Sequence, residues 1–526
     1  MSNLPLLSIV LWLPLVGAVI LAVFPRRAEG AVKATGLIVS LLTFAMSLAI
    51  LPRFLVGTAG MQLVELHPWI PDWGINYGLG IDGLSLWLVL LTTFLTPIVL
   101  LSSWYSIHRY PKEYVISMLA LEFGMIGAFL ATDLILFYVF FELMLIPMYL
   151  IIGVWGGVNR IYAAIKFFIF TIAGSLLMLV GILYLGFLHF QQTGAMSFAI
   201  EDLYGLSIAA KAQVLMFFAF AIAFAIKVPL FPLHTWLPDA HVEAPTGGSI
   251  ILAGVLLKLG TYGFLRFVLP FFPEAAGEWA WLFGVLAVIG IIYGALVAWV
   301  QPDMKKLVAY SSVSHLGFCV LGIFAMTQAS VTGSVLQSIN HGISTGALFL
   351  LVGVIYDRRH TRQLADFGGL ARIMPVYAAI FVISALSSVG LPGLNGFVGE
   401  FLILAGSFET MPRLTIFAAL GVILAAIYLL WLIQKVFYGP VVHEENRDLP
   451  DMRWNELLAV LPLVVMMVWM GLFPQPFIRR IEPTVEQLIA VSTRGGGERP
   501  VLAARETATD AEPVAEQHTS ESGAAR

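Results

Sequence analysis

Apolar stretches of about 20 residues recur along almost the whole chain, separated by short polar segments. A helix of this length spans the ~30 Å hydrocarbon core of a membrane. The pattern therefore predicts an all-α, polytopic membrane protein with about 14 transmembrane helices. The expected helices cover residues 4–24, 31–51, 84–106, 114–131, 134–155, 161–188, 211–236, 247–270, 279–300, 304–326, 331–356, 373–408, 413–438 and 455–478. Residues 61–83 are too polar to span, and we expect a structured external loop there.

Basic residues in the loops support this assignment. Sixteen Lys and Arg residues follow the odd-numbered helices, whereas four follow the even-numbered ones. Cytoplasmic loops carry the excess of Lys and Arg in membrane proteins. We therefore expect both termini on the periplasmic side of the membrane. The segment 491–526 is rich in Gly, Ala, Glu and Thr without apolar periodicity, and it is predicted to be a disordered tail.

The composition agrees with a membrane protein and excludes several kinds of site. Apolar residues make up 59% of the chain and charged residues 11%, whereas soluble domains carry about 25% charged residues. The single cysteine, Cys319, excludes disulfides and Cys-based metal or iron–sulfur sites. No glycine-rich segment has the strand–turn–helix context of a nucleotide site. His234 and His241, separated by prolines, do not have the spacing of zinc ligands.

Two expected helices are interrupted. Helix 7 contains Pro229 and Pro232, and helix 12 contains Pro392 and four glycines within residues 387–400. Proline removes a backbone donor and breaks a helix, and lipid tolerates such breaks only where protein or water satisfies the backbone. The breaks lie five helices apart, a spacing that favours two inverted five-helix repeats with discontinuous helices near the midplane. The expected units are residues 1–110, 111–272, 273–440, 441–490 and 491–526.

Several ionisable residues lie inside the expected helices or beside their breaks. Each charge at a helix centre costs about 2.5–3.5 kcal/mol on insertion scales, so these side chains are expected to face one another and water. The candidate site residues are Glu142, Lys227, His234, Lys258, His315, His341 and Glu400.

These residue types together favour a path for protons. Moving Glu142 away from Lys227 would promote release of a proton from the lysine, and re-pairing would recapture it. Lys258 and the histidines could pass protons sideways, since histidine titrates near neutral pH. Glu400 could deliver or receive protons at the far side.

Structural alternatives remain open for the same residues. Glu142 and Lys227 could form a buried salt bridge that only orders the bundle. His315 and His341 could be core histidines with satisfied hydrogen bonds. The roles of Glu122 and Asp133 stay ambiguous from the sequence.

Four segments carry a resemblance to a known family. They are KVPLFPLHTWLPDAHVEAPT, YVFFELMLIPMY, LLKLGTYG and GLPGLNGFVGEF, and they resemble the antiporter-like membrane subunits of respiratory complex I. The similarity covers nearly the whole chain up to about residue 480. It implies two inverted five-helix repeats with broken helices 7 and 12.

The resemblance also implies roles for individual residues. Glu142 and Lys227 match the family's helix-5 glutamate and helix-7 lysine, Lys258 its helix-8 lysine, and His341 its helix-11 histidine. Most relatives carry lysine in broken helix 12, and Glu400 at that position is similar to the subunit M branch, the counterpart of mitochondrial chain 4.

The function implied by the resemblance is proton translocation coupled to NADH oxidation by quinone. The chain would be a non-redox subunit of this translocase, in a bacterial inner (plasma) membrane. It would hold no cofactor or metal itself, with NADH, FMN, iron–sulfur clusters and quinone in partner subunits. The expected partners are other membrane-arm subunits, including flanking antiporter-like subunits, and the lipid bilayer, but no nucleic acid.

Three rival functions are kept alongside this one. The chain could belong to a multi-chain sodium/proton antiporter, which Glu400 argues against, or to a proton-pumping hydrogenase complex. It could also be an inert scaffold whose buried charges only hold a membrane arm together.

Overall fold

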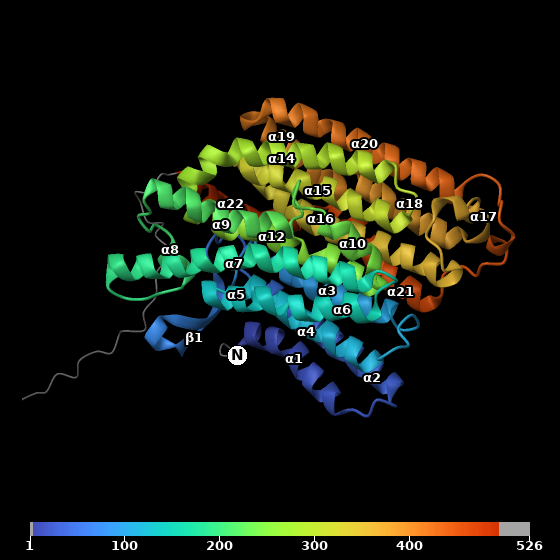
Figure 1. Ribbon diagram of the computed structural model, residues 1–526, viewed down its shortest axis with the longest axis horizontal. Coiled ribbons are helices and arrows are strands. Elements are labelled where there is room, and N and C mark those ends of the chain that lie inside the picture. Colours follow the sequence, from blue (N-terminus) through green and yellow to red (C-terminus); the bar gives the residue numbers. More distant parts are fainter. Residues whose placement is uncertain (1–3, 494–526) are drawn as a thin grey trace, which may run out of the picture.

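The structure is a computed structural model in which residues 4–493 are described. Figure 1 shows a bundle of long helices that run roughly side by side. Twelve helices of the described chain are long and apolar enough to cross a membrane. Two further apolar helices, α3 (Leu86–Ser102) and α18 (Pro375–Val389), are shorter. The polytopic helical fold is thus confirmed, whereas the count of about 14 spans and the inverted repeats remain predictions.

The N-terminal part supplies three helices and a hairpin. The elements are α1 (Leu6–Val23), α2 (Glu29–Leu48), β1 (Gln62–Ile70), β2 (Ile75–Ile81) and α3. The two strands pair antiparallel, with Glu65 opposite Leu79. The carboxylate of Glu65 accepts hydrogen bonds from the backbone N–H groups of Leu7 and Ser8 at 2.8 and 3.0 Å. The predicted structured loop is therefore a hairpin tied to the start of α1.

The next part of the chain contains the first break. Its elements are α4 (Pro111–Leu130), α5 (Leu134–Leu143), α6 (Leu145–Trp155), α7 (Arg160–Thr193), α8 (Ile200–Leu203), α9 (Ala210–Lys227), α10 (Trp236–Glu243), α11 (Thr246–Ile251), α12 (Lys258–Gly263) and α13 (Leu269–Phe271). Predicted helix 7 is broken as expected, because α9 ends at Lys227 and α10 begins nine residues later, at Trp236. The α5–α6 division at Met144 lies three residues before Pro147, whose missing N–H weakens the helix there.

Residues 246–271 form one buried span that includes two π-helical turns, at 252–256 and 264–268. A π-helical turn shifts the backbone hydrogen-bond ladder, and such turns are frequent at functional sites. Lys258 lies two residues after the end of the first of these turns.

The C-terminal half contains the second break. Its elements are α14 (Pro273–Trp299), α15 (Met304–Ala325), α16 (Gln328–Arg359), α17 (Leu370–Ile373), α18, α19 (Asn395–Thr410), α20 (Pro412–Phe437), α21 (Trp454–Leu472) and α22 (Gln475–Thr493). Predicted helix 12 is divided into α18 and α19, which are separated by residues 390–394. This is the glycine- and proline-rich segment in which the break was expected.

The chain beyond α21 differs in detail from the prediction. The last predicted span, 455–478, ends earlier, at Leu472, and a second helix, α22, follows it. The apolar pattern missed this division because Gly471 and Pro474 interrupt a run that is otherwise apolar. The predicted tail was expected to begin at residue 491, but α22 continues to Thr493. The rest of that tail lies outside the described residues.

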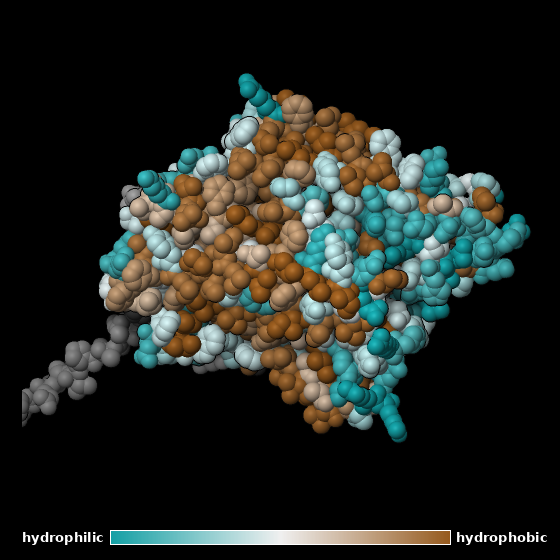
Figure 2. Space-filling model, viewed as in Figure 1, coloured by the Kyte–Doolittle hydropathy of each residue, from teal (hydrophilic) through white to brown (hydrophobic). Residues whose placement is uncertain are grey.

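The polar centre of the fold lies on its most buried helices. The most apolar stretches of the spans 246–271 and 328–359 are completely buried, and that of 304–325 is nearly so. By contrast, less than half of the most apolar stretch of α7 and of α20 is buried in the isolated chain. Figure 2 shows apolar side chains in a broad band across the visible face, with hydrophilic side chains gathered at the end near α17. A lipid-facing belt around a polar core is the arrangement expected for buried ionisable groups in a membrane.

Candidate functional site

Lys258 is the central cation of the fold. It starts α12 and is completely buried. Its Nζ donates a hydrogen bond to the carbonyl oxygen of Ala253, in the preceding π-helical turn. The same Nζ lies 2.7 Å from Nδ1 of His341 on α16. The structure therefore brings two of the predicted site residues, 83 positions apart in the sequence, into direct contact.

A second pair continues from this contact. The rings of His341 and His315 have centroids 6.1 Å apart. Nδ1 of His315, on α15, donates to Oε1 of Glu400, on α19, at 2.9 Å. Nε2 of His315 lies 3.2 Å from the hydroxyl of Tyr428, on α20. With a proton on Nδ1, the neutral ring accepts a hydrogen bond from this hydroxyl through Nε2. Both nitrogens of His315 thus have a partner.

Amide side chains hold Glu400 and the break next to it in place. Nε2 of Gln337 donates to Oε1 of Glu400 at 2.9 Å. Asn340 lies on α16, as does Gln337. Its Nδ2 donates to Oε1 of Gln337 and to the carbonyl oxygen of Asn395. The hydroxyl of Ser387 donates to Oδ1 of Asn395 at 2.5 Å. These bonds connect the two sides of the interrupted helix, as required for a broken helix in lipid.

Lys227 lies at the other break and has a different environment. It is the last residue of α9, it is 1% exposed, and its Nζ has no hydrogen-bond partner among the described residues. The ammonium lies over the ring of Phe141, 4.6 Å from its centroid. An ammonium at this distance is stabilised by the negative face of the ring. The aromatic ring thus holds Lys227 in the absence of a direct ion pair.

Glu142 does not form an ion pair with Lys227 in this conformation. The ion pairs of the described chain do not include either residue. Glu142 is partly exposed, and its Oε1 has no hydrogen-bond partner in the part of the chain that the structure describes. Glu142 and Lys227 are close enough to interact electrostatically. The structure therefore does not show the fixed salt bridge of the structural alternative.

The two histidines after the first break lie in different places. His234 is in the connection before α10, where its ring stacks on Phe231 and meets Tyr293 edge-on. It contacts no other predicted site residue through a hydrogen bond within the described chain. His241, on α10, is completely buried and stacks on Phe349 with centroids 4.6 Å apart. Within residues 4–493, neither of its ring nitrogens has a hydrogen-bond partner.

The polar line is the set of buried side chains that runs from Lys258 through His341 and His315 to Glu400. Sequence reasoning missed several residues that contact or neighbour it. From the sequence, His241 was considered only as a metal ligand. In the structure it lies close enough to Lys258 to interact with it electrostatically. Gln337 could have been found, because it precedes His341 by one helical turn and therefore shares its face. Tyr428 carries no sequence signal, since one tyrosine in an apolar helix is ordinary. Among residues 4–493, no cluster of His, Cys, Asp and Glu could hold a metal ion.

The two ambiguous acids have distinct surroundings. Asp133 precedes α5, and its Oδ1 accepts from the N–H groups of Ile135 and Leu136 at 3.0 and 3.2 Å. Its Oδ2 accepts from the N–H of Asn76 at 3.0 Å. Asp133 is thus a helix cap for the segment that carries Glu142. Glu122, on α4, is fully buried, and no residue of the described chain donates a hydrogen bond to either of its carboxyl oxygens.

Two family models match consecutive parts of the sequence. Residues 131–427 match the transmembrane family of NADH:quinone oxidoreductase and Mrp antiporters. Residues 32–131 match the amino terminus of NADH-ubiquinone oxidoreductase chain 4. Together the matches cover both breaks and every predicted site residue.

Curated relatives match over almost their full length. NADH-quinone oxidoreductase subunit M of Rhodobacter capsulatus is 48% identical over 495 residues, which are 92% of this chain and 96% of that protein. NADH-ubiquinone oxidoreductase chain 4 of Marchantia polymorpha is 44% identical over 484 residues, 92% of this chain and 97% of the relative.

Solved structures show the same fold. A chain in respiratory complex I from Thermus thermophilus with bound NADH superposes with a TM-score of 0.84 at 34% identity, over 94% of this chain and all of that one. A chain of the Mrp complex from Dietzia sp. DQ12-45-1b reaches a TM-score of 0.79 at 22% identity, which shows a shared fold alone.

Proposed function

Because this chain belongs to the family of antiporter-like membrane subunits of NADH:quinone oxidoreductase, with relatives of the subunit M and chain 4 type, we propose that its buried polar line carries protons. The chain is a multi-pass membrane subunit of a multi-subunit complex of this type. Our proposal concerns which residues move the proton and in what order.

One observation carries the proposal: four ionisable side chains from four helices form a buried line. Lys258 bonds His341, whose ring lies next to His315, which bonds Glu400. All four are at most 3% exposed. Buried ionisable groups in a membrane are expensive and mark ion or proton pathways. A purely structural role would need only separate pairs of hydrogen-bonded side chains. Here the Lys258–His341 pair lies next to the His315–Glu400 pair, so the two form a continuous line.

The contact between Lys258 and His341 favours transfer because it holds one excess proton. Two positive charges 2.7 Å apart would repel by about 6 kcal/mol at an effective dielectric constant of about 20. The lysine and the imidazole therefore share a single cationic proton. When a further proton approaches from the side of Lys227, the pair would relieve this repulsion by passing a proton towards His315 and Glu400.

Lys227 and Glu142 would act as the switch at the start of this line. Pairing with the carboxylate stabilises the ammonium form of Lys227, and separation leaves it over the ring of Phe141. Separation would thus promote proton release towards Lys258. A change in the distance between α5 and α9, imposed by a neighbouring subunit, would alternate the two states.

The remaining predictions complete the proposed role. NADH, FMN, iron–sulfur clusters and quinone would be bound by partner subunits, so this chain would be non-redox. Its membrane would be a bacterial inner membrane with both termini on the periplasmic side.

Replacing His315 with glutamine tests the proposed line. The amide of His315→Gln can still hydrogen-bond Glu400 but cannot carry a proton as imidazole does. We expect an assembled complex whose NADH-driven proton uptake into inside-out vesicles falls by about 10²-fold or more, the range for loss of a positioned proton-transfer group. The matched control is His108→Gln, an exposed loop histidine, which should pump normally. Normal pumping in an assembled His315→Gln complex would contradict the proposal.

The sodium/proton antiporter function is tested on the same vesicles. The Mrp likeness extends to the fold, so ²²Na⁺ uptake is measured beside proton uptake. Proton uptake that is unchanged by sodium supports the proton pump, whereas uptake that requires sodium exchange favours the antiporter.

A further inference from the structure

The proposed path through Lys258, His341, His315 and Glu400 is called the proton line. A buried ion pair lies away from it, at the end of the molecule that carries the hairpin. Nη2 of Arg266 lies 2.5 Å from Oδ2 of Asp82, and both residues are at most 7% exposed. Asp82 follows β2 and precedes α3, whereas Arg266 lies in the second π-helical turn of the span 246–271. The pair therefore joins two segments 184 residues apart.

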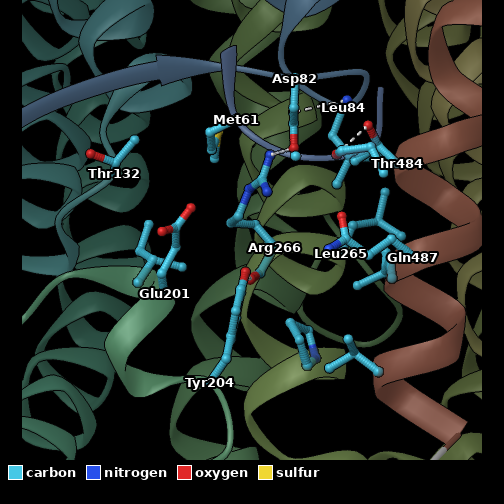
Figure 3. Close-up of a pocket in the computed structure, with 16 residues that line it drawn as sticks. Met61, Asp82, Leu84, Thr132, Glu201, Tyr204, Leu265, Arg266, Thr484 and Gln487 are labelled. Carbon is cyan, nitrogen blue, oxygen red and sulfur yellow. Dashed lines mark hydrogen bonds and ion pairs between the residues drawn. The ribbon is translucent and has the colours of Figure 1, made fainter. Parts of the chain in front are cut away.

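The pair forms one wall of a cavity that has both polar and apolar lining residues. Figure 3 shows Arg266 extending from its helix to Asp82, with Glu201 on one side and Gln487 of α22 on the other. The cavity measures about 70 Å³, enough for several water molecules. Thr484 of α22 closes it further by accepting from the N–H of Gly83 and donating to the carbonyl oxygen of Ala59.

Behind this wall, polar side chains lead back to the proton line. Lys258, Tyr262 and Arg266 occur at four-residue intervals on one span, a spacing that places side chains on one helical face. The hydroxyl of Tyr262 accepts a hydrogen bond from Nε of Arg266 at 3.2 Å and donates to the carbonyl oxygen of Phe129 at 3.4 Å. Arg266 lines the cavity, whereas Tyr262 does not.

We propose that the Asp82–Arg266 pair, together with Tyr262, is a proton-tight seal between Lys258 and the cavity at the hairpin end. This inference rests on the proposed proton line. In this role the three residues prevent a proton leak, so that protons on Lys258 move to His341 and not into the cavity.

The chemistry of the three side chains explains the seal. Arginine does not deprotonate in proteins, so it cannot relay a proton. The hydroxyl proton of Tyr262 points to Phe129, and its oxygen is occupied by Arg266. The rings of Phe129 and Phe137 surround Tyr262 at centroid distances of 5.3 and 6.4 Å and exclude water from its other sides. Asp82 neutralises the guanidinium and holds it in place.

The seal is tested by passive proton flux, without NADH, in liposomes that contain the complete complex. A potassium diffusion potential set by valinomycin drives the flux, and a trapped pH indicator reports it. Arg266→Met should raise the flux several-fold, because it releases the Tyr262 hydroxyl and opens the wall. The matched control is Arg413→Met, an exposed arginine at the start of α20, which should stay tight.

A double variant separates a specific leak from general damage. Adding Tyr262→Phe to Arg266→Met removes the hydroxyl that would relay protons, and it should return the flux to the native value. Liposomes of assembled Arg266→Met that stay as tight as native ones would overturn the proposal, as would a double variant that leaks equally. If Arg266→Met fails to assemble, Asp82→Asn tests the seal from its other side, because it removes the carboxylate that holds the guanidinium in place, and it should also raise the flux.

This experiment is distinct from the test of the proton line. If His315→Gln pumps normally, the proposed line fails, whatever the passive flux. If Arg266→Met stays tight while His315→Gln loses pumping, only the seal fails.

Discussion

Nζ of Lys258 lies 2.7 Å from Nδ1 of His341, and this contact joins the two halves of the polar line. Lys258 belongs to the span that follows the first break, and His341 belongs to the helix before the second. A proton shared by these two groups therefore belongs to neither half alone.

Lys227→Ala tests the switch at the start of the line. Loss of the ammonium should leave the complex assembled but lower both NADH oxidation by quinone and proton uptake by about 10²-fold, because the two processes are coupled. Assembly on native gels, NADH oxidation and proton uptake are measured in native membranes. Lys211→Ala, at an exposed cation of the same helix, is the control. Unchanged activities would mean that Lys227 is structural.

Lys258→Met and His341→Leu test the shared proton. Each single variant should abolish most proton uptake, and the double variant should be no worse than either single one. Residues that act as a unit show such non-additivity. Pumping rates of the three variants form a double-mutant cycle, and effects that simply multiply would show that the two residues act independently.

Glu400→Gln tests whether this residue carries a proton or only accepts hydrogen bonds. The amide oxygen can still accept from His315 and Gln337, so assembly and thermal stability should hardly change. Proton uptake should fall by about 10²-fold, since an amide does not titrate. Glu409→Gln, on the exposed end of the same helix, is the matched control. A Glu400→Gln complex that pumps at the native rate would leave Glu400 a structural acceptor.

Gly260→Ala tests the close approach of α12 to α9. A Cβ atom at Gly260 would lie 2.7 Å from the carbonyl oxygen of Phe224 and from the N atom of Val228, and backbone cannot move aside easily. Overpacking of this kind costs about 1–3 kcal/mol. We expect the purified complex to lose this subunit at a lower temperature. Gly277→Ala, where a Cβ meets nothing within 4 Å, should be neutral or stabilising.

Asp133 gives a prediction on pH. Burial raises the pKa of the Asp133 carboxyl, and hydrogen bonds from the N–H groups of Asn76, Leu136 and Ile135 oppose this rise. The folded state therefore holds this proton more tightly than the unfolded chain does. The resulting stabilisation is complete below the unfolded pKa and is lost as the pH rises through the folded pKa.

Two substitutions separate the charge of Asp133 from its capping role. Asp133→Asn keeps the cap and should remove this pH dependence of thermal stability while pumping continues. Asp133→Ala also loses the cap and should destabilise by about 0.5–2 kcal/mol. Melting temperatures of the purified complex at pH 5 and pH 8 distinguish the two variants. An Asn variant that retains the native pH profile would assign the titration to another group.

The sequence by itself predicted the polytopic helical fold, the two breaks and the candidate charges, but not the exact bounds of every span. These are local properties: a helix long enough to cross the bilayer needs a continuous apolar run, and proline removes a donor wherever it stands. A buried charge is costly in lipid whatever surrounds it, so Lys258 and Glu400 could be selected without coordinates.

Only the tertiary structure decided which groups meet. The separation of Lys227 from Glu142, the bond of Tyr428 to His315 and the Asp82–Arg266 pair depend on how distant helices pack, and no spacing along the chain encodes them. The physical reason is that a hydrogen bond or ion pair needs atoms within about 3–4 Å, whereas periodicity specifies only the face of a helix. The packing of the helices around the two breaks determines which of these faces meet and which side chains come within bonding distance.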